Sequence, residues 1–275
     1  MALFAATKVT IIIQTTNAFR RFFSILLAII IFITNFALQT IFAMKFVTLP
    51  FNNGAFRPLS FYLAMEEYLA SRVVEPECFF LWQVKPSVIF GRNQVMHNEV
   101  NTDYCTEHGI KVFRRKSGGG CVYADEGNIM LSYVTNDKSV PLVFHRFLGF
   151  LLLVLRRMGI EAVSTSHNDV LIGGLKVSGS ALRLLPVRCI VHSTLLYDTD
   201  MENMTHAITP STQKLQAKGI ESVRQRITLL KDYTSLTLEQ VKDTIREILC
   251  QGELALTDDD VEKIEAIAAE RYTLL

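Results

Sequence analysis

The sequence has few cysteines and no pairing pattern among them. The five cysteines are Cys78, Cys105, Cys121, Cys189 and Cys250, an odd number without any C-x-x-C pair. Disulfide-stapled domains and structural zinc sites both need paired spacings. The pattern therefore argues against both classes of protein and is typical of a reducing compartment.

The sequence also has no excess of charge of either sign. Its 28 basic and 27 acidic residues give a formal net charge of +1. A nucleic-acid-binding protein usually carries a clear basic surplus, so we expect no nucleic-acid partner. Lys8, Arg20 and Arg21 are the only charged residues in positions 1–43, which leaves the rest of the chain slightly acidic.

One long hydrophobic run stands apart from the rest. Phe22–Ala43 is uncharged and exceeds the length of about 20 residues that spans a bilayer as a helix. Arg20 and Arg21 precede the run, which would keep the N-terminus inside and export the body. Its end makes a poor signal-peptide cleavage site. We expect residues 1–43 to be either a membrane anchor or a stretch upstream of a true start at Met44.

The helical patterns come at both ends of the body and in its middle. Ser60–Arg72 is expected to be a helix that Ser60 caps, with Glu66 and Glu67 away from its apolar side. Three more helices are expected over Leu142–Met158, over Leu238–Leu249 behind a Thr237/Gln240 capping box, and from Thr257 and Asp260 toward Tyr272.

Strand patterns lie between these helices. They cover Cys78–Val84, Ser87–Phe90, Gly109–Phe113, Asn128–Val134, Asp169–Ile172, Lys176–Leu185 and Arg188–Tyr197. Lys85-Pro86 and Gly173-Gly174 separate two pairs of them as turns. Since strands and helices do not alternate strictly, the pattern favours an α+β or mixed-sheet α/β domain over a doubly wound fold.

The stretch Arg114–Asn128, RRKSGGGCVYADEGN, carries the strongest chemical signal. Three consecutive glycines cost backbone entropy, but they let backbone N–H groups approach an anion closely. Arg114 and Arg115 can add forked hydrogen bonds to phosphate or carboxylate. The stretch lacks the Walker and dinucleotide-binding patterns. The plainer interpretation is a flexible surface turn with solvated arginines.

A second stretch, HNDVLIGGLKVSGS, runs from His167 to Ser180. Lys176 stands on an expected strand between two glycine-bearing turns, where its ammonium could contact a carboxylate and an α-phosphate together. The commoner interpretation of a lone lysine is an exposed strand residue. Asn168 and Asp169 could bind a metal or a ribose, or serve only in the turn.

A third stretch, RCIVHSTLL, places His192 inside an apolar strand. Such a residue is more often a satisfied core histidine than a functional one. Cys121 and Cys189 have no adjacent base in the sequence, and we interpret both as packing residues.

In order and spacing, four segments together resemble the lipoate–protein ligase A family: RRKSGGGCVYADEGN, ND…LKVSGSA, HSTLL and KLQAKGIESVRQR. FLW…VIFGRNQ, at Phe80–Gln94, is similar to the family's early strand pair. The resemblance covers about Leu59 to about Tyr272. It implies a catalytic domain over residues 44–275 with the family's fold of mixed sheets flanked by helices, which biotin ligases and octanoyl transferases share.

The resemblance also implies an activity and a site. The family uses ATP and Mg²⁺ to convert lipoate to lipoyl-AMP, then acylates a lysine of lipoyl domains in 2-oxoacid dehydrogenase E2 subunits and of the glycine cleavage H protein. Lys176 would be the catalytic residue that contacts both the lipoyl carbonyl and the phosphate. Arg92 and His192 would lie beside the lipoyl group, with Asn168 and Asp169 near the phosphates and Asp169 on Mg²⁺. The ATP and adenylate site would comprise Arg115, Gly118, Gly119, Gly120, Cys121, Val122 and Tyr123.

This sequence departs from the family pattern in three places. His167 stands where the family usually has arginine, and Ser193 follows His192 where the family typically has His-Gly. The chain stops at RYTLL, before the family's W-x-W-N-x-G segment and its small accessory domain. We expect a separate partner to supply that domain, another mode of closure, or a truncated or compromised enzyme.

Two other functions remain open from the sequence. An octanoyl or lipoyl transferase of the same fold would need no ATP but a cysteine thiolate, and the matching stretch Ser164–Asn168 has no cysteine, which favours a ligase. A non-catalytic lipoate-binding module is the other alternative. A biotin ligase fits less well, because RRKSGGG is not a GRGRxGR-type loop. ATP chemistry indicates a cytoplasmic location, with membrane anchorage through residues 22–43 as the alternative.

Overall fold

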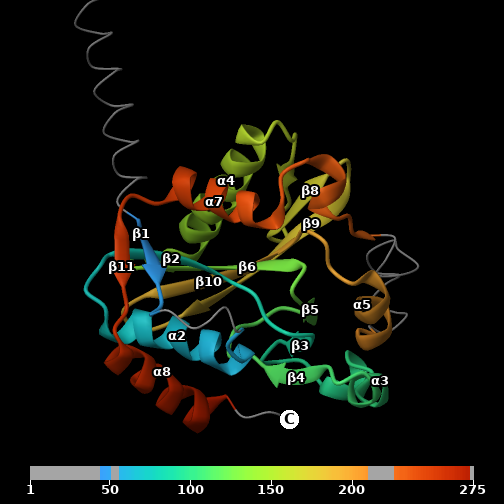
Figure 1. Ribbon diagram of the computed structural model, residues 1–275, viewed down its shortest axis with the longest axis horizontal. Coiled ribbons are helices and arrows are strands. Elements are labelled where there is room, and N and C mark those ends of the chain that lie inside the picture. Colours follow the sequence, from blue (N-terminus) through green and yellow to red (C-terminus); the bar gives the residue numbers. More distant parts are fainter. Residues whose placement is uncertain (1–43, 51–55, 210–225, 273–275) are drawn as a thin grey trace, which may run out of the picture. The chain divides into compact units, whose positions relative to one another are not determined.

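The computed structural model describes residues 44–50, 56–209 and 226–272. Two mixed sheets organise these residues (Figure 1). The large sheet has the order β11-β1-β2-β6-β10-β9-β8-β7. Its strands are β1 (Lys45–Thr48), β2 (Glu77–Trp82), β6 (Asn128–Thr135), β7 (Val163–Ser164), β8 (Asp169–Ile172), β9 (Leu175–Leu184), β10 (Cys189–Leu196) and β11 (Glu253–Ala255).

The centre of the large sheet is antiparallel and buried on both faces. β6 pairs with β2 on one side and with β10 on the other, and every residue of β6 and β10 is buried. Helices α2 (Leu59–Arg72) and α8 (Asp258–Arg271) cover one face, while α4 (Val140–Arg157) and α7 (Leu238–Leu249) cover the other (Figure 1). This double cover explains the near-continuous apolar sequence of both strands.

The small sheet holds β4 (Lys111–Arg114), β3 (Ser87–Phe90) and β5 (Val122–Ala124), in that order. β3 pairs in parallel with β4 and antiparallel with β5. β2 and β3 flank the Lys85-Pro86 turn as expected, but they belong to different sheets and do not pair. The chain thus passes between the two sheets at this turn.

Helix α2 corrects two sequence-based expectations. It begins at Leu59 with Pro58 as the N-cap and no side-chain cap, so the prediction that Ser60 caps it was wrong. Glu66 and Glu67 do not face solvent, because only 4% and 6% of their surfaces are exposed. The helix packs between the large sheet and α8, which leaves it no solvated face over these turns.

The other predicted helices are confirmed with small changes of boundary. α4 follows the N-cap Ser139 and has a proline in its first turn, a position that proline favours. α7 and α8 begin with complete capping boxes from Thr237 with Gln240 and from Thr257 with Asp260.

Several short elements were not predicted. They include α3 (Thr102–Glu107), α5 (Met201–Ala207) and the 3₁₀ turns η1 (Met96–Asn98) and η3 (Leu230–Tyr233), as well as β1, β5, β7 and β11. Side chains of Asn101 and Asp200 cap α3 and α5. Elements this short show too little periodicity to be recognised from sequence. The predicted strand at Gly109 begins at Lys111 instead, after a positive φ of 65° at Gly109.

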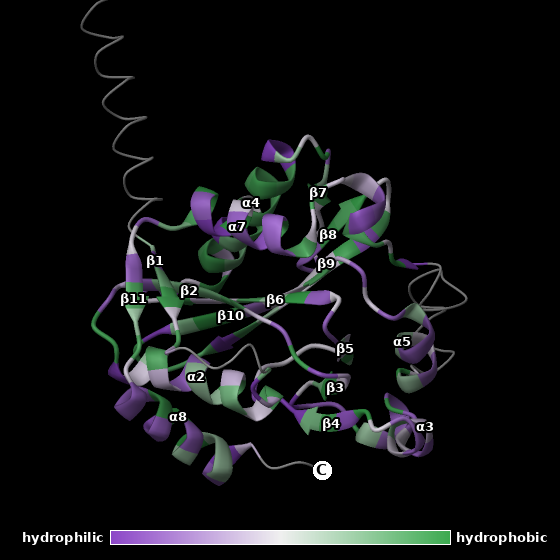
Figure 2. Cartoon of the chain, in the orientation of Figure 1, coloured by the Kyte–Doolittle hydropathy of each residue, from purple (hydrophilic) through white to green (hydrophobic). Residues whose placement is uncertain are grey.

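Hydropathy follows this layering. Hydrophobic colouring runs along β6 and α4, whereas α8 alternates between hydrophilic and hydrophobic residues (Figure 2). Within residues 44–50, 56–209 and 226–272, no helix combines the length and apolarity needed to cross a bilayer. The expectations for residues 1–43 and for most of KLQAKGIESVRQR lie outside the described residues.

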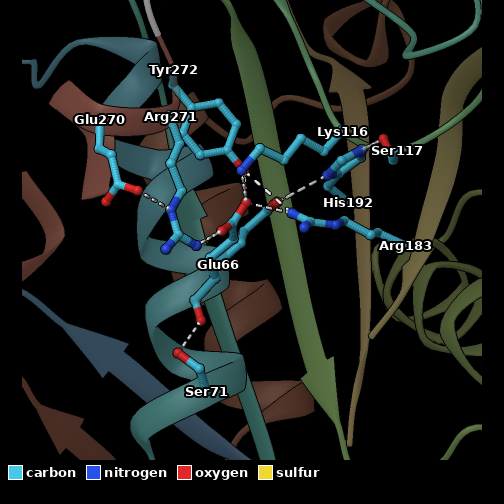
Figure 3. Close-up of polar contacts among 10 residues, drawn as sticks. Glu66, Ser71, Lys116, Ser117, Arg183, His192, Glu270, Arg271 and Tyr272 are labelled. Atoms are coloured by element: carbon cyan, nitrogen blue, oxygen red, sulfur yellow. Dashed lines mark hydrogen bonds and ion pairs between the residues drawn. The ribbon is translucent and has the colours of Figure 1, made fainter. Parts of the chain in front are cut away.

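The buried carboxylate of Glu67 ties α2 to three other parts of the chain. It accepts hydrogen bonds from Lys116 at 2.7 Å, from Arg271 at 3.0 Å, and from Arg183 and Tyr272. Figure 3 labels these four partners. Burial alone raises the pKa of Glu67. Hydrogen bonds from Lys116, Tyr272 and Arg183 outweigh that effect and hold the pKa at about 2, below its ordinary value of 4.5.

We predict that Glu67→Gln lowers the free energy of unfolding by about 2–3 kcal/mol at pH 7, because it leaves three partly exposed cationic partners without their buried counter-charge. Since folding lowers the pKa of Glu67, its stabilisation is complete above pH 4.5 and is lost as the pH falls toward about 2. Denaturant unfolding at several pH values should therefore show the gap between wild type and variant closing in acid. Glu265→Gln, which removes the ion pair between an exposed carboxylate of α8 and Arg57, is the matched control. A gap that is independent of pH would contradict the assignment.

Candidate active site

A cavity of about 600 Å³ lies between strands of both sheets. Its apolar wall includes Leu63, Trp82, Ile89 and Met130. Nine of the sequence-predicted site residues line the same cavity: Arg115, Gly119, Gly120, Cys121, Val122, Tyr123, Asp169, Lys176 and His192. The fold therefore brings together the three stretches that the sequence singled out.

The triple-glycine bend connects β4 to β5 along one side of this cavity. Gly119 has φ +89°, a conformation that favours glycine. Gly91 packs directly beneath it, because a Cβ atom at Gly91 would lie 2.1 Å from the carbonyl oxygen of Gly119. The backbone N–H of Arg92 donates to the carbonyl of Ser117 at 2.9 Å. The bend is therefore fixed by close backbone contacts rather than being a loose surface turn.

Arg115 points into the protein and holds the bend from inside. Only 4% of its surface is exposed. Its Nη2 donates to the carbonyls of Gly118 and Gly120 at 2.7 and 2.8 Å, and its Nη1 donates to Ile89 at 3.0 Å. Burial lowers the pKa of Arg115 to about 10, so the guanidinium remains charged at neutral pH. The interpretation of Arg115 as a solvated arginine is therefore wrong.

The same bend leaves its N–H groups available. Among the described residues, no hydrogen bond uses the backbone N–H of Gly118, Gly119, Gly120 or Cys121. In a trans peptide the N–H points opposite to the C=O. Because Arg115 draws in the carbonyls of Gly118 and Gly120, the N–H groups of Gly119 and Cys121 point away from it. Successive free N–H groups of this kind form an anion-binding concavity.

Lys176 enters the cavity from β9. Its Nζ lies 2.8 Å from Asp169 Oδ1. A Cβ atom at Gly179 would lie 2.4 Å from this Nζ and 2.6 Å from Cε, so the glycine provides the space that the lysine occupies. Burial lowers the pKa of Lys176; Asp169 opposes the decrease, while Arg226 and Arg115 add to it. The ammonium group of Lys176 is thus destabilised by burial and by two neighbouring arginines. A bound anion would stabilise this charged form.

Asp169 joins two cations at the cavity wall. Besides Lys176, it accepts a hydrogen bond from Arg226, which also lines the cavity. Arg226 was missed, because nothing in SVRQR distinguishes it from its neighbouring arginine. Asn168 adopts a positive φ of 61° and bonds Thr165 through its backbone, so it shapes the turn and does not line the cavity.

The described residues do not fit a protein-built Mg²⁺ site. No group of three or more His, Cys, Asp or Glu side chains converges anywhere in the ranges 44–50, 56–209 and 226–272. The carboxylate of Asp169 is already shared by the cations of Lys176 and Arg226. Mg²⁺ prefers several oxygen ligands at near-octahedral geometry, which this cation-rich arrangement lacks.

His192 is both a satisfied core histidine and a cavity residue. Its Nε2 lies 2.6 Å from Ser117 Oγ, and its Nδ1 lies 3.1 Å from Glu66 Oε2 (Figure 3). Glu66 was not predicted as part of the site, because its spacing in α2 resembles that of a solvent-facing residue. The contact spans 126 positions of sequence, and no local pattern could have revealed it.

Arg92, His167 and Cys121 differ in their positions relative to the cavity. Arg92 is exposed and does not line the cavity. His167 does line it, although its side chain is exposed. Burial raises the pKa of the Cys121 thiol to about 12, which agrees with its interpretation as a packing residue rather than a thiolate nucleophile.

Comparison with known proteins identifies the class of this catalytic domain. Residues 58–249 match the family model described as the lipoyl protein ligase A/B catalytic domain. The fold is similar to an archaeal bi-partite lipoate protein ligase of Thermoplasma acidophilum, solved in a study with its E2 lipoyl domain, with a TM-score of 0.68, 24% identity and coverage of 83% of this chain and 91% of that one. It is also similar to a lipoate-protein ligase A bound with ATP, with a TM-score of 0.64, 24% identity and coverage of 82% and 92%.

Sequence similarity then defines the family. The chain is 35% identical over 239 residues to lipoate–protein ligase 1 of Staphylococcus aureus, covering 83% of this chain and 71% of that protein. The chain belongs to the lipoate–protein ligase family and is an enzyme of the ligase class.

The missing side chain at Gly179 allows a test of whether the position of Lys176 matters for catalysis. Gly179→Ala should displace Nζ of Lys176 and lower the turnover of ATP-dependent lipoylation by about 10²-fold, the usual effect of losing one preorganised donor. Gly149→Ala is the matched control, since that exposed glycine in α4 has open space around it. Circular dichroism and thermal unfolding would establish that both variants fold. Normal turnover in a folded Gly179→Ala variant would show that the position of Lys176 is not critical.

Proposed function

We propose that this chain is a lipoate–protein ligase that joins lipoate to AMP and then transfers the lipoyl group to a lysine of an acceptor domain. The observation that carries the proposal is that Lys176 lines one cavity with Gly119, Gly120 and Cys121, whose backbone N–H groups make no hydrogen bond among the described residues. Two similar proteins support the choice of substrates. One was solved with ATP bound, and the other was studied with its E2 lipoyl domain.

The first step is the attack of the lipoate carboxylate on the α-phosphorus of ATP. A bond forms between a carboxylate oxygen and phosphorus, the bond from that phosphorus to the bridging oxygen breaks, and pyrophosphate leaves. The approach of two anions opposes the step. The ammonium of Lys176 and the N–H groups of the bend offset the accumulating negative charge.

The second step is the attack of a neutral lysine amine of the acceptor on the carbonyl of lipoyl-AMP. An amide bond forms, AMP leaves, and the amine nitrogen loses a proton. Negative charge develops on the carbonyl oxygen during the attack. Lys176 stabilises that oxygen with the same ammonium that served the phosphate, and it is not itself acylated.

The apolar wall suits the rest of the substrate. Leu63, Trp82 and Met130 provide a surface for an aliphatic chain and a dithiolane ring. A pocket of this kind distinguishes close analogues only weakly, so octanoate should also enter.

The acceptors, the metal ion and the location follow from the same chemistry. We propose that lipoyl domains of 2-oxoacid dehydrogenase E2 subunits and the glycine cleavage H protein are the acceptors. Mg²⁺ would accompany the phosphates of ATP rather than occupy a protein cage. A reaction that consumes ATP fits the cytoplasm.

The alternative, an ATP-independent acyl transferase, needs a cysteine thiolate. Among the described residues, Cys121 is the cysteine that lines the cavity, and burial raises its pKa to about 12. A group protonated so firmly is a poor acyl acceptor at neutral pH. This observation favours the ligase.

We predict that Lys176→Ala lowers lipoate-dependent ATP–pyrophosphate exchange by about 10²–10³-fold, because the transition state loses a preorganised cation. Lys138→Ala is the control, since that lysine is exposed and contacts the carbonyl of Pro186. Near-normal exchange in Lys176→Ala would contradict its role. If the wild-type protein shows no exchange but accepts an acyl group from an acyl-carrier protein without ATP, the transferase is the correct function.

Because the pKa of Lys176 is lowered, we predict that the rate of the first step decreases at alkaline pH. Deprotonation removes the ammonium charge, so kcat/KM for lipoate in the exchange reaction should fall as the pH rises, with an apparent pKa below the ordinary lysine value of 10.5. Lys176→Arg keeps its charge to higher pH, and its residual activity should show the decline at higher pH. The same decline in both proteins would assign it to another group.

A further inference from the structure

A chain of buried polar contacts links helix α2 to the glycine bend. The carboxylate of Glu66 accepts a hydrogen bond from Ser132 Oγ at 2.6 Å and lies 3.1 Å from Nδ1 of His192. On the other side of the imidazole, Nε2 lies 2.6 Å from Ser117 Oγ. Figure 3 shows His192 between Glu66 and Ser117. Glu66 takes no direct part in the proposed reaction. Burying a carboxylate nevertheless costs free energy unless the group is hydrogen-bonded.

For an ionised carboxylate and a neutral imidazole, each of these hydrogen bonds has one direction. An ionised carboxylate only accepts, so Nδ1 of His192 carries a hydrogen and donates to Glu66. In the neutral imidazole Nε2 is then the acceptor, and the Ser117 hydroxyl donates to it. The Ser117 oxygen in turn accepts from Nε of Arg115 at 3.0 Å. The order along the chain is therefore Arg115 to Ser117, Ser117 to His192, and His192 to Glu66.

This order determines what Arg115 can do. Nε of Arg115 is held by Ser117 Oγ at 3.0 Å and by the carbonyl of Gly118 at 3.1 Å, which fixes the guanidinium plane. Its two terminal nitrogens then reach the carbonyls of Ile89, Gly118 and Gly120. Those contacts set the direction of the N–H groups in the bend. We propose that Glu66 is a positioning residue for the adenylation step: through His192, Ser117 and Arg115 it orients the backbone N–H groups that bind the phosphate.

The neighbouring residue in α2 reinforces the bend at a second point. Glu67 holds Nζ of Lys116 at 2.7 Å, so two consecutive carboxylates of α2 anchor two consecutive residues of the bend. Successive residues of a helix point about 100° apart. Glu66 can therefore contact β10 while Glu67 contacts β9 and the last residue of α8.

The serine is not a nucleophile, although Ser117, His192 and Glu66 have the contacts of a Ser-His-acid triad. Only 2% of the surface of Ser117 is exposed, and it does not line the cavity. Its oxygen is also occupied by Arg115. Acylation of Ser117, detected by mass spectrometry after incubation with lipoate and ATP, would overturn the positioning role.

The inference rests on the proposed function, and a double-mutant cycle of Glu66→Gln and Ser117→Ala tests it. Both single variants should lower kcat of lipoate-dependent ATP–pyrophosphate exchange by about tenfold, with KM for lipoate changed by no more than about twofold. The double variant should lose no more than the stronger single one, because both residues act through one chain. Ser117→Ala makes the test possible even if Glu66→Gln folds poorly, since it removes only a hydroxyl group.

Glu77→Gln is the matched control. Its carboxylate bonds Tyr133 and Arg146 away from the cavity, so the variant should lose stability while keeping its kcat. Wild-type kcat in Ser117→Ala, or losses that add in the double variant, would overturn the positioning role. So would a loss of kcat that follows thermal stability in all three single variants. Absence of exchange in the wild-type protein would instead overturn the proposed function.

Discussion

The inward guanidinium of Arg115 is the constraint on which the rest of the site depends. A buried arginine must find acceptors for its N–H groups, and most of those acceptors here are backbone carbonyls, two of them in the glycine bend. Because the C=O and N–H of a trans peptide point in opposite directions, inward carbonyls place the N–H groups of the same peptides outward. The glycines allow this geometry, and Gly91 allows the close approach beneath it. The arginine thus sets the direction of the N–H groups through the backbone carbonyls that it binds.

A second feature is a small positive excess in the cavity, because Arg115, Lys176 and Arg226 line it together with only two carboxylates among the described residues, those of Glu99 and Asp169. Lys176, Arg226 and Arg115 lie close enough for the two arginines to lower the pKa of the lysine further, and Asp169 is the counter-ion that restrains it. Without an anion, Asp169 is shared between Lys176 and Arg226. A bound phosphate or carboxylate would supply the missing negative charge. The same electrostatics that destabilise the ammonium therefore favour an anionic substrate.

The sequence predicted the features that are local and missed those that are long-range. The glycine bend, the hairpin at Gly173-Gly174, the Thr237/Gln240 capping box and the helix start at Thr257 depend on residues a few positions apart. The common cavity of Lys176 and the bend was expected from a family resemblance. In contrast, the burial of Glu66 depends on Ser132 and His192, which lie 66 and 126 positions along the chain. The inward direction of Arg115 depends on the folded shape of the bend itself and on the carbonyl of Ile89 in β3. Helical spacing alone makes a glutamate look solvated, and only tertiary packing shows that α2 has no solvent face there.

The departure from the family pattern at Ser193 is also explained by tertiary packing. Its hydroxyl lies 2.8 Å from Ser178 Oγ, accepts from Ser180 at 3.1 Å, and donates to the carbonyl of Gly179 at 3.1 Å. These contacts join β9 and β10 at the residue whose missing side chain leaves room for Lys176. A serine in this position satisfies its own polar group within the strand pair, so the substitution is compatible with the lysine position that the proposed chemistry needs.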